Sequence, residues 1–281
     1  MTRDDLLVRQ MSKTVSHTSC FSSITFFQQT TMSDISSLSS QYSNTAEDSP
    51  QPQAAGKIVP ALIVIDMQND FVYGSLAVPG GESIIDPIND LIRLPFATRI
   101  ATRDFHPDNH ISFARTHQQT EFEKKIIYDP DDHLEKWGIE QTLWPVHCVA
   151  YSGGADFVPG LNALAFDAVI HKGTHPRIES YSAFRDIWGK RETDLPAILR
   201  DRGVTDIYFC GLAGDYCVKY TAIDSMEYGY NTWIVSDAIR SIDTEETTWL
   251  DVADSKGVKF TTVDKLTQLM LSDKVANLSI N

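Results

Sequence analysis

The sequence of 281 residues is 42% hydrophobic and 22% charged, a composition that suits a globular protein with a full core. Its net charge of −14 argues against a nucleic-acid partner, because nucleic-acid binding depends on clustered Lys and Arg. No run of about 18 apolar residues occurs, so we expect no membrane span and no membrane partner.

Residues 1–56 differ in composition from the rest of the chain. The stretch from Ser12 to Ser49 is rich in Ser, Thr and Gln and has neither a helical nor a strand period. Because such a segment has few aliphatic residues to bury, we expect a disordered N-terminal extension. Basic residues among the hydroxyl residues leave a targeting role open, although Asp4 and Asp5 weaken it, and Met32 is an alternative start.

From residue 57 onward, short apolar segments alternate with amphipathic ones. The run from Ile58 to Ile65 is rich in β-branched residues, as in a strand that is buried on both faces. Further strands are expected at Thr98–Thr102, Ala168–His171, Asp206–Cys210, Asn231–Val235 and Val258–Thr262, and helices at about Ser83–Leu94, Asp194–Arg202, Cys217–Tyr228 and Glu245–Lys256. This alternation predicts a single doubly wound α/β domain at 57–281 with a six-stranded, mainly parallel sheet.

One long segment, from Phe113 to Asp156, interrupts the alternation. It is polar, and it contains the sequence Trp144-Pro145-Val146-His147. A loop of this length is usually either functional or disordered.

Four cysteines are present, without a CxxC pair and without an apolar secretion signal before them; they are Cys20, Cys148, Cys210 and Cys217. This pattern favours reduced thiols over a disulfide framework. We therefore expect a cytoplasmic protein, and leave a nuclear or organellar pool open.

An acidic residue, Asp66, directly follows the first predicted strand. Ligands of open parallel sheets bind beyond the carboxyl ends of the strands, so this position suits chemistry. An Asp that caps the following loop would produce the same pattern. On this feature alone, both interpretations stand.

Two further reactive residues are expected at the same sheet edge. Cys217 follows the strand at 206–210 after a glycine-containing turn, where a helix N-terminus would lower the pKa of a thiol and its N–H groups could bind an oxyanion. A small buried hydrophobic residue is the alternative for Cys217. Lys172 directly follows the strand expected at 168–171 and could polarise the thiol, with a solvated surface lysine as the alternative.

A candidate metal site comes from two short motifs. Asp104 and His106 are two residues apart, so on an extended segment their side chains point the same way. With His147 they offer one carboxylate and two imidazoles, a set that suits zinc, iron or manganese and leaves positions for water and substrate. His110 could orient this set or join it. Scattered structural residues are the alternative.

Taken together, these segments resemble the nicotinamidase family, within the isochorismatase-like cysteine hydrolases. The matching segments are Ile65–Phe71, Thr102–Ala114, Trp144–Cys148, Lys172–Gly173, Tyr181–Phe184 and Gly211–Val218. They occur in the order of the family, and the resemblance extends over nearly all of residues 58–240. One departure is Phe105, where the family usually has Trp; because both are large aromatic residues, we expect little consequence.

The resemblance implies a role for each matching residue. It makes Asp66 the general base, Lys172 its catalytic partner and Cys217 the nucleophile. It also implies metal ligands at Asp104, His106 and His147, aromatic substrate contacts at Phe71, Trp144 and Tyr181, and oxyanion donors at the N–H groups of Ala213 and Cys217. A cis peptide bond is implied between Leu212 and Ala213, and Glu179 would lie in the outer shell of the metal.

The implied reaction is the hydrolysis of nicotinamide to nicotinate and ammonia through a thioester on Cys217, in NAD salvage. One divalent metal ion would hold the pyridine nitrogen, with zinc expected first and iron or manganese as alternatives. The expected partner is thus the small molecule nicotinamide, and pyrazinamide is a related substrate; a homo-oligomer is compatible with the resemblance.

Two other functions are alternatives. The nearest is another isochorismatase-like amidohydrolase that acts on a ureido or carbamoyl compound, but those relatives generally lack the metal set. The second is a catalytically silent protein that binds nicotinamide. Such a protein would not need Asp66, Lys172 and Cys217 together.

Overall fold

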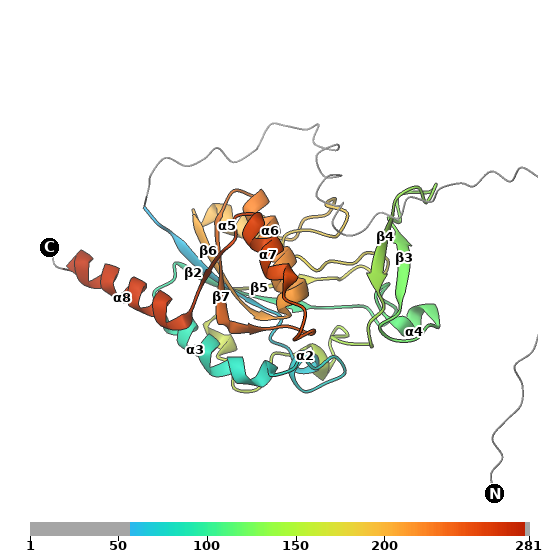
Figure 1. Cartoon of the computed structure of the whole chain (residues 1–281), viewed down its shortest axis with the longest axis horizontal. Coiled ribbons are helices and arrows are strands. Elements are labelled where there is room, and N and C mark those ends of the chain that lie inside the picture. The colour runs from blue at the N-terminus through green and yellow to red at the C-terminus, as the bar shows by residue number, and fades with distance from the viewer. Residues whose placement is uncertain (1–56, 279–281) are drawn as a thin grey trace, which may run out of the picture.

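The computed structural model describes residues 57–278, so the predicted N-terminal extension at 1–56 lies outside the described residues. The described chain forms a six-stranded sheet with helices on both faces (Figure 1). The strands of this sheet are β1 (Pro60–Ile65), β2 (Thr98–Asp104), β5 (Ala168–Lys172), β6 (Asp206–Leu212), β7 (Asn231–Arg240) and β8 (Lys259–Thr261). Each contains one of the predicted strands, in whole or in part.

The strand order of the sheet is β5-β2-β1-β6-β7-β8, and every neighbouring pair is parallel. The chain first builds outward from β1 to β2 and β5, and then returns to build β6, β7 and β8 on the other side of β1. A crevice forms beyond the carboxyl ends of the strands at such a reversal of direction. The predicted doubly wound α/β fold is therefore confirmed.

Alternate residues of β1 supply the two hydrophobic cores. Leu62 and Val64 belong to one core, together with residues of α3 (Ile85–Arg93) and α8 (Val263–Leu278). Ala61, Ile63 and Ile65 belong to the other, which is covered by three helices, α5 (Leu195–Asp201), α6 (Lys219–Glu227) and α7 (Thr248–Ser255). Figure 1 shows these two groups of helices on opposite sides of the sheet. A strand that is buried on both faces needs this double cover, which explains its continuous apolar sequence.

The segment at 113–156 contains more regular structure than its sequence predicted. It includes α4 (Ala114–His117) and an antiparallel hairpin of β3 (Lys124–Tyr128) and β4 (Gly138–Thr142), which stands apart from the main sheet in Figure 1. A short helix, α2 (Asn69–Val72), follows β1. Over the described part of the chain, no helix combines the length and the apolar character that crossing a membrane would require.

Candidate active site

Three charged residues stand at the ends of adjacent strands. Asp66 directly follows β1, and its backbone takes a left-handed conformation with φ of 47°. Asp104 is the last residue of β2 and Lys172 the last residue of β5, and the register of these strands pairs the two residues directly. All three side chains are almost completely buried. Parallel strands therefore bring together the two carboxylates and the cation that the sequence predicted at this edge.

The ammonium group of Lys172 is the centre of this cluster. Its Nζ lies 2.8 Å from Oδ2 of Asp66, 2.5 Å from Oδ1 of Asp104 and 3.2 Å from Sγ of Cys217. Although burial opposes the charge, the two carboxylates raise the pKa of Lys172 well above its ordinary value. Lys172 is thus a buried cation that compensates two acids, and the alternative of a surface lysine is wrong.

Cys217 lies in a π-helical turn, Gly214–Val218, that leads from β6 into α6. Its Sγ lies within 4.8 Å of carboxylate oxygens of both Asp66 and Asp104. Burial raises the pKa of this thiol well above its ordinary value, and Lys172 only partly opposes that effect. The predicted lowering of the thiol pKa is therefore wrong, because burial outweighs the effect of the Lys172 ammonium. A buried thiol of this kind needs a base to remove its proton.

Asp66 is placed to be that base. Burial raises the pKa of its carboxyl group, and the ammonium of Lys172 acts in the opposite direction. A carboxylate whose pKa is raised by burial accepts a proton more readily than an exposed one. The geometry therefore combines an acceptor, a cation and a thiol in one buried group.

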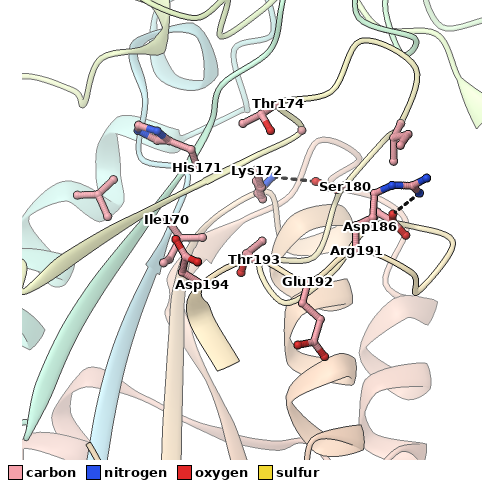
Figure 2. Close-up of a pocket in the computed structure, with 13 residues that line it drawn as sticks. Ile170, His171, Lys172, Thr174, Ser180, Asp186, Arg191, Glu192, Thr193 and Asp194 are labelled. Atoms are coloured by element: carbon pink, nitrogen blue, oxygen red, sulfur yellow. Dashed lines mark hydrogen bonds and ion pairs between the residues drawn. The ribbon is translucent and has the colours of Figure 1, made fainter. Parts of the chain in front are cut away.

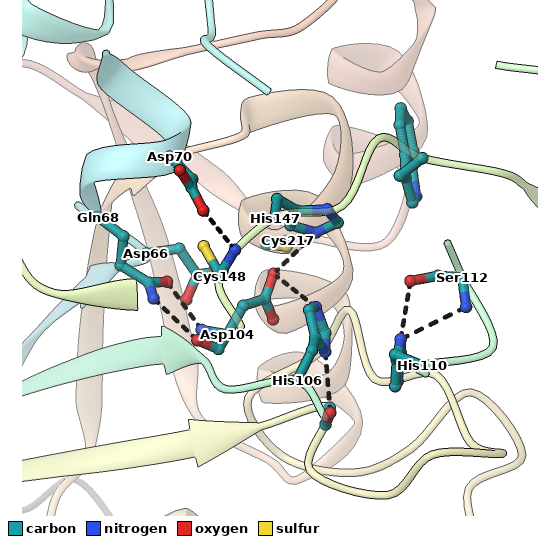
Figure 3. A network of polar contacts seen from close by, with 12 residues as sticks. Asp66, Gln68, Asp70, Asp104, His106, His110, Ser112, His147, Cys148 and Cys217 are labelled. Carbon is teal, nitrogen blue, oxygen red and sulfur yellow. Dashed lines mark hydrogen bonds and ion pairs between the residues drawn. The ribbon is translucent and has the colours of Figure 1, made fainter. Parts of the chain in front are cut away.

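A second group, adjacent to the first, consists of Asp104, His106 and His147 (Figure 3). One ligand atom from each lies within 4.8 Å of the others, and all three residues are buried. Nε2 of His106 is 3.5 Å from Oδ2 of Asp104, and Nε2 of His147 is 3.9 Å from the same oxygen. The three residues predicted as metal ligands are therefore brought together.

The hydrogen bonds of the two imidazoles fit a metal ion. Nδ1 of His106 donates to the carbonyl of Gly173 at 2.8 Å, and Nδ1 of His147 donates to the carbonyl of Pro145 at 2.7 Å. Because carbonyls only accept, both rings in the neutral form present an unprotonated Nε2 toward Asp104. Metal-bound histidines commonly have this arrangement, with the second nitrogen fixed by an oxygen atom.

The electrostatics of the same group also favour a cation. Burial and the neighbouring His106 lower the pKa of His147 to about 3, so this ring is neutral. Although burial acts to lower it, the carboxylate of Asp104 raises the pKa of His106. The pKa of Asp104 itself lies below its ordinary value, because Lys172 and His106 outweigh the effect of burial. A carboxylate that stays charged while buried attracts a positive charge, which a divalent metal ion would supply.

His110 does not join these ligands. Its ring stacks on that of His106 with centroids 4.1 Å apart. Its Nε2 lies 3.0 Å from the carbonyl of Ile178 and its Nδ1 lies 2.8 Å from the hydroxyl of Ser112, so both nitrogens are engaged. Of the two roles considered for His110, orienting the metal group is the one that the geometry supports. Glu179 is also outside the ligand set, although its buried charge acts on His106.

Two side chains of the segment after β1 hold the ligands in place and were not singled out from the sequence. The buried amide of Gln68 bonds both the N–H and the carbonyl of Asp104, each at 2.8 Å. The carboxylate of Asp70 accepts a hydrogen bond of 2.7 Å from the N–H of Cys148, next to His147. The position of these polar side chains shortly after a strand was a signal that they lie near the site. The sequence does not show which backbone groups they will hydrogen-bond.

Aromatic side chains wall the site. Phe71 packs against His147, with ring centroids 5.3 Å apart. Tyr181 accepts a hydrogen bond of 3.1 Å from Nε1 of Trp144, and all three predicted aromatic residues are buried. Tyr216, which the sequence analysis missed, joins this wall with its ring centroid 4.9 Å from that of Trp144 and 5.4 Å from that of Tyr181. Flat rings of this kind suit a planar aromatic ligand.

The peptide bond between Leu212 and Ala213 is cis, as predicted. It lies at the end of β6, directly before the turn that carries Cys217. Ala213 therefore links the end of β6 to the turn that carries Cys217.

A cavity of about 350 Å³ opens next to this site, between β5 and the loop that precedes α5 (Figure 2). Lys172 and Ser180 form part of its wall, and Figure 2 shows the contact between them. Asp66, Asp104 and Cys217 are not among its lining residues. Of the four reactive residues, Lys172 therefore lines this cavity and the other three do not.

Comparisons with known proteins agree on one family of hydrolases. The isochorismatase domain family matches residues 60–264. The nicotinamidase of Escherichia coli (strain K12) is 40% identical over 187 residues, which cover 65% of this chain and 84% of that protein. A solved structure of the Acinetobacter baumanii nicotinamidase and pyrazinamidase is 36% identical with a TM-score of 0.68, and the match covers 75% of this chain and 99% of that one. The pyrazinamidase of Pyrococcus horikoshii in complex with zinc is 38% identical with a TM-score of 0.57, over 73% of this chain and 99% of that one.

Proposed function

The chain belongs to the isochorismatase family, and we propose that within this family it is a nicotinamidase, which hydrolyses nicotinamide to nicotinate and ammonia. The observation that carries the proposal is the position of Lys172, whose Nζ is in contact with Asp66, Asp104 and Cys217 at once. This contact joins a base and a thiol to a carboxylate of the metal group. The 40% identity to a curated nicotinamidase supports the choice of substrate.

In the proposed reaction Asp66 takes the proton from Sγ of Cys217, and the resulting thiolate attacks the carbonyl carbon of the amide. The ammonium of Lys172 stabilises the thiolate and keeps the carboxylate of Asp66 in reach. The backbone N–H groups of Ala213 and Cys217 are the proposed donors to the oxyanion. Asp66 then gives its proton to the leaving nitrogen, and ammonia departs as the C–N bond breaks.

The second half of the reaction removes the acyl group from Cys217. Asp66, now a carboxylate again, takes a proton from a water molecule that attacks the thioester. Breakage of the C–S bond releases nicotinate, and the proton on Asp66 returns to Sγ. One residue thus serves as base in both halves, which a carboxylate with a raised pKa can do.

Asp104, His106 and His147 are the residues that would hold a divalent metal ion, and zinc is our proposal for its identity, with iron or manganese as alternatives. The relative from Pyrococcus horikoshii, whose structure is described with zinc, supports this choice. When bound, the ion would supply a Lewis-acidic position for the ring nitrogen of the substrate. Phe71, Trp144 and Tyr181 are the proposed walls for the ring.

A substrate panel tests the proposal. The purified, metal-loaded protein is assayed for ammonia release from nicotinamide, pyrazinamide, benzamide and an N-carbamoyl amino acid, with metal analysis of the same sample. We expect turnover of the first two and little of benzamide, which has no ring nitrogen. Ammonia from the carbamoyl compound alone would replace the proposal by the nearest alternative. Binding of nicotinamide without ammonia release would indicate a silent binding protein.

A further inference from the structure

The threonine at position 102 makes two hydrogen bonds with one residue. Its hydroxyl accepts a bond of 3.1 Å from the backbone N–H of Asp66 and donates one of 2.6 Å to Oδ1 of the same Asp66. Both residues are completely buried. A hydroxyl has a single proton, so the donor capacity of Thr102 is used entirely on this carboxylate.

These two bonds hold an unusual backbone. Asp66 has a left-handed conformation, which glycine adopts most readily and Asp and Asn adopt occasionally, with the help of local hydrogen bonds. Thr102 lies on β2 directly beyond the pairing of Val64 with Ala101, so its side chain reaches the residue that leaves β1. The hydroxyl therefore fixes both the backbone turn of Asp66 and the orientation of its carboxylate.

The consequence concerns the other oxygen of that carboxylate. Oδ1 is occupied by Thr102, whereas the contact of Oδ2 within the described part of the chain is its ion pair with Nζ of Lys172 at 2.8 Å. The same Nζ lies 3.2 Å from Sγ of Cys217. Oδ2 is thus the carboxylate oxygen that is left to accept the thiol proton.

We propose that Thr102 is a positioning residue for catalysis, which saturates Oδ1 of Asp66 and so directs Oδ2 toward the Cys217 thiol. The inference rests on the proposed amide hydrolysis by Cys217. Without the hydroxyl, the carboxylate can rotate and its two oxygens share the proton-accepting position. The orientation of the base is then no longer fixed, and the proton transfer that starts each turnover becomes slower.

The chain supplies a matched control on the same strand. Thr98 is also completely buried, but its hydroxyl donates to Asp167 at 3.2 Å, at the opposite end of β2. Thr98→Val therefore removes a buried hydroxyl from the same strand without touching Asp66. A purely structural role for β2 hydroxyl groups predicts the same effect from both substitutions.

The test compares Thr102→Val, Thr102→Ser and Thr98→Val with the parent protein, using kcat and KM for nicotinamide, bound metal and Tm. We expect Thr102→Val to lower kcat about 10- to 100-fold, a part of the usual contribution of a general base, with KM changed by less than about twofold and metal retained. Thr102→Ser keeps the hydroxyl and should restore most of kcat. Thr98→Val should leave kcat and KM unchanged, whatever its Tm.

A second measurement needs no turnover. Alkylation of Cys217 by iodoacetamide requires the same loss of the thiol proton. Its rate is measured by mass spectrometry of the peptide that contains Cys217. We expect slower alkylation in Thr102→Val and recovery in Thr102→Ser. The positioning role would be overturned if Thr102→Val kept the kcat and the alkylation rate of the parent. It would also be overturned if Thr102→Ser or Thr98→Val lost as much kcat and alkylation rate as Thr102→Val. A parent protein that is inactive on nicotinamide refutes the proposed function instead, while the alkylation comparison still decides the role of Thr102.

Discussion

Nζ of Lys172 lies 2.5 Å from Oδ1 of Asp104, so the group that surrounds the thiol and the group that would hold a metal share an ion pair. The contact follows from the register of the sheet, which places these two residues opposite each other on β5 and β2. The remaining oxygen of Asp104 faces the two histidines. One carboxylate therefore contributes to both groups.

Replacement of Lys172 tests this shared role. In Lys172→Met, two buried carboxylates lose their common cation, and the removal of one partner from a buried ion pair costs about 3–5 kcal/mol of unfolding free energy. We expect that loss in denaturant unfolding, together with loss of turnover. Lys124→Met is the control: its ion pair with Glu140 is largely open to solvent and should contribute less than about 1 kcal/mol.

A double substitution sharpens the same test. Asp66→Asn removes one of the two carboxylates that Lys172 compensates. Lys172→Met combined with Asp66→Asn should therefore be less destabilised than the sum of the single substitutions. Equal stability of Lys172→Met and the parent would show that the buried pairs are not formed.

Gly173 supports the metal ligand His106. A Cβ at this position would lie 2.3 Å from Cε1 of the His106 ring, and φ is 62°. We expect Gly173→Ala to displace the ring and to lower metal affinity about 10- to 100-fold, as losses of supporting contacts do. Metal analysis after dialysis measures this, with His147→Ala as the reference for a lost ligand.

Gly203 provides the control for backbone strain. Its φ of 63° nearly equals that of Gly173, but a Cβ there would meet nothing within 4 Å. Gly203→Ala should therefore be destabilised by strain alone and keep its metal. If both variants retain metal equally, Gly173 has no role in holding His106.

The hydroxyl of Tyr181 connects the hairpin segment to the aromatic wall. It accepts hydrogen bonds from Nε2 of Gln141 at 2.7 Å and from Nε1 of Trp144 at 3.1 Å. Tyr181→Phe keeps the ring but removes the acceptor, so we expect KM for nicotinamide to rise about 3- to 10-fold with little change in kcat. Tyr228→Phe, whose hydroxyl contacts Glu192 outside the site, is the control and should leave KM as it is. A fall in kcat at constant KM would contradict a role in substrate binding.

We also propose that residues 57–281 constitute the hydrolase domain. Every residue of the candidate site lies between Asp66 and Cys217, and the first strand of the sheet begins at Pro60. A protein that starts at residue 57 should therefore keep kcat/KM within about twofold of the parent and nearly the same Tm. A large loss of either quantity would show that residues 1–56 contribute to the folded domain.

Much of the fold could be predicted because its central strands are buried on both faces. The continuous apolar run before Asp66 predicted a strand that is buried on both faces. The polar residues that follow such runs identified the edge of the sheet at which the reactive residues lie. Helix α8 (Val263–Leu278) was missed because its apolar residues do not recur with a clear helical period. The hairpin of β3 and β4 was missed because both strands mix charged, polar and apolar residues.

The residues of the site that escaped prediction share a physical reason. The contacts that give these residues their roles join chain segments that are distant in sequence, as for Gln68 and Thr102, or join aromatic rings, as for Tyr216. No periodicity in the sequence marks such contacts. The direction of the pKa shift of Cys217 was also predicted wrongly, because the turn before α6 was visible in the sequence and the burial of the thiol was not.

The central claim is that the thiol of Cys217 cleaves nicotinamide, and the most direct test is ammonia release by Cys217→Ala beside the parent and Cys210→Ala. Cys210 is a buried core residue of β6, so its replacement controls for the loss of a thiol. We predict that the parent and Cys210→Ala release ammonia, and that Cys217→Ala binds nicotinamide and metal like the parent but releases none. Ammonia release by Cys217→Ala at a rate near that of the parent would contradict the account.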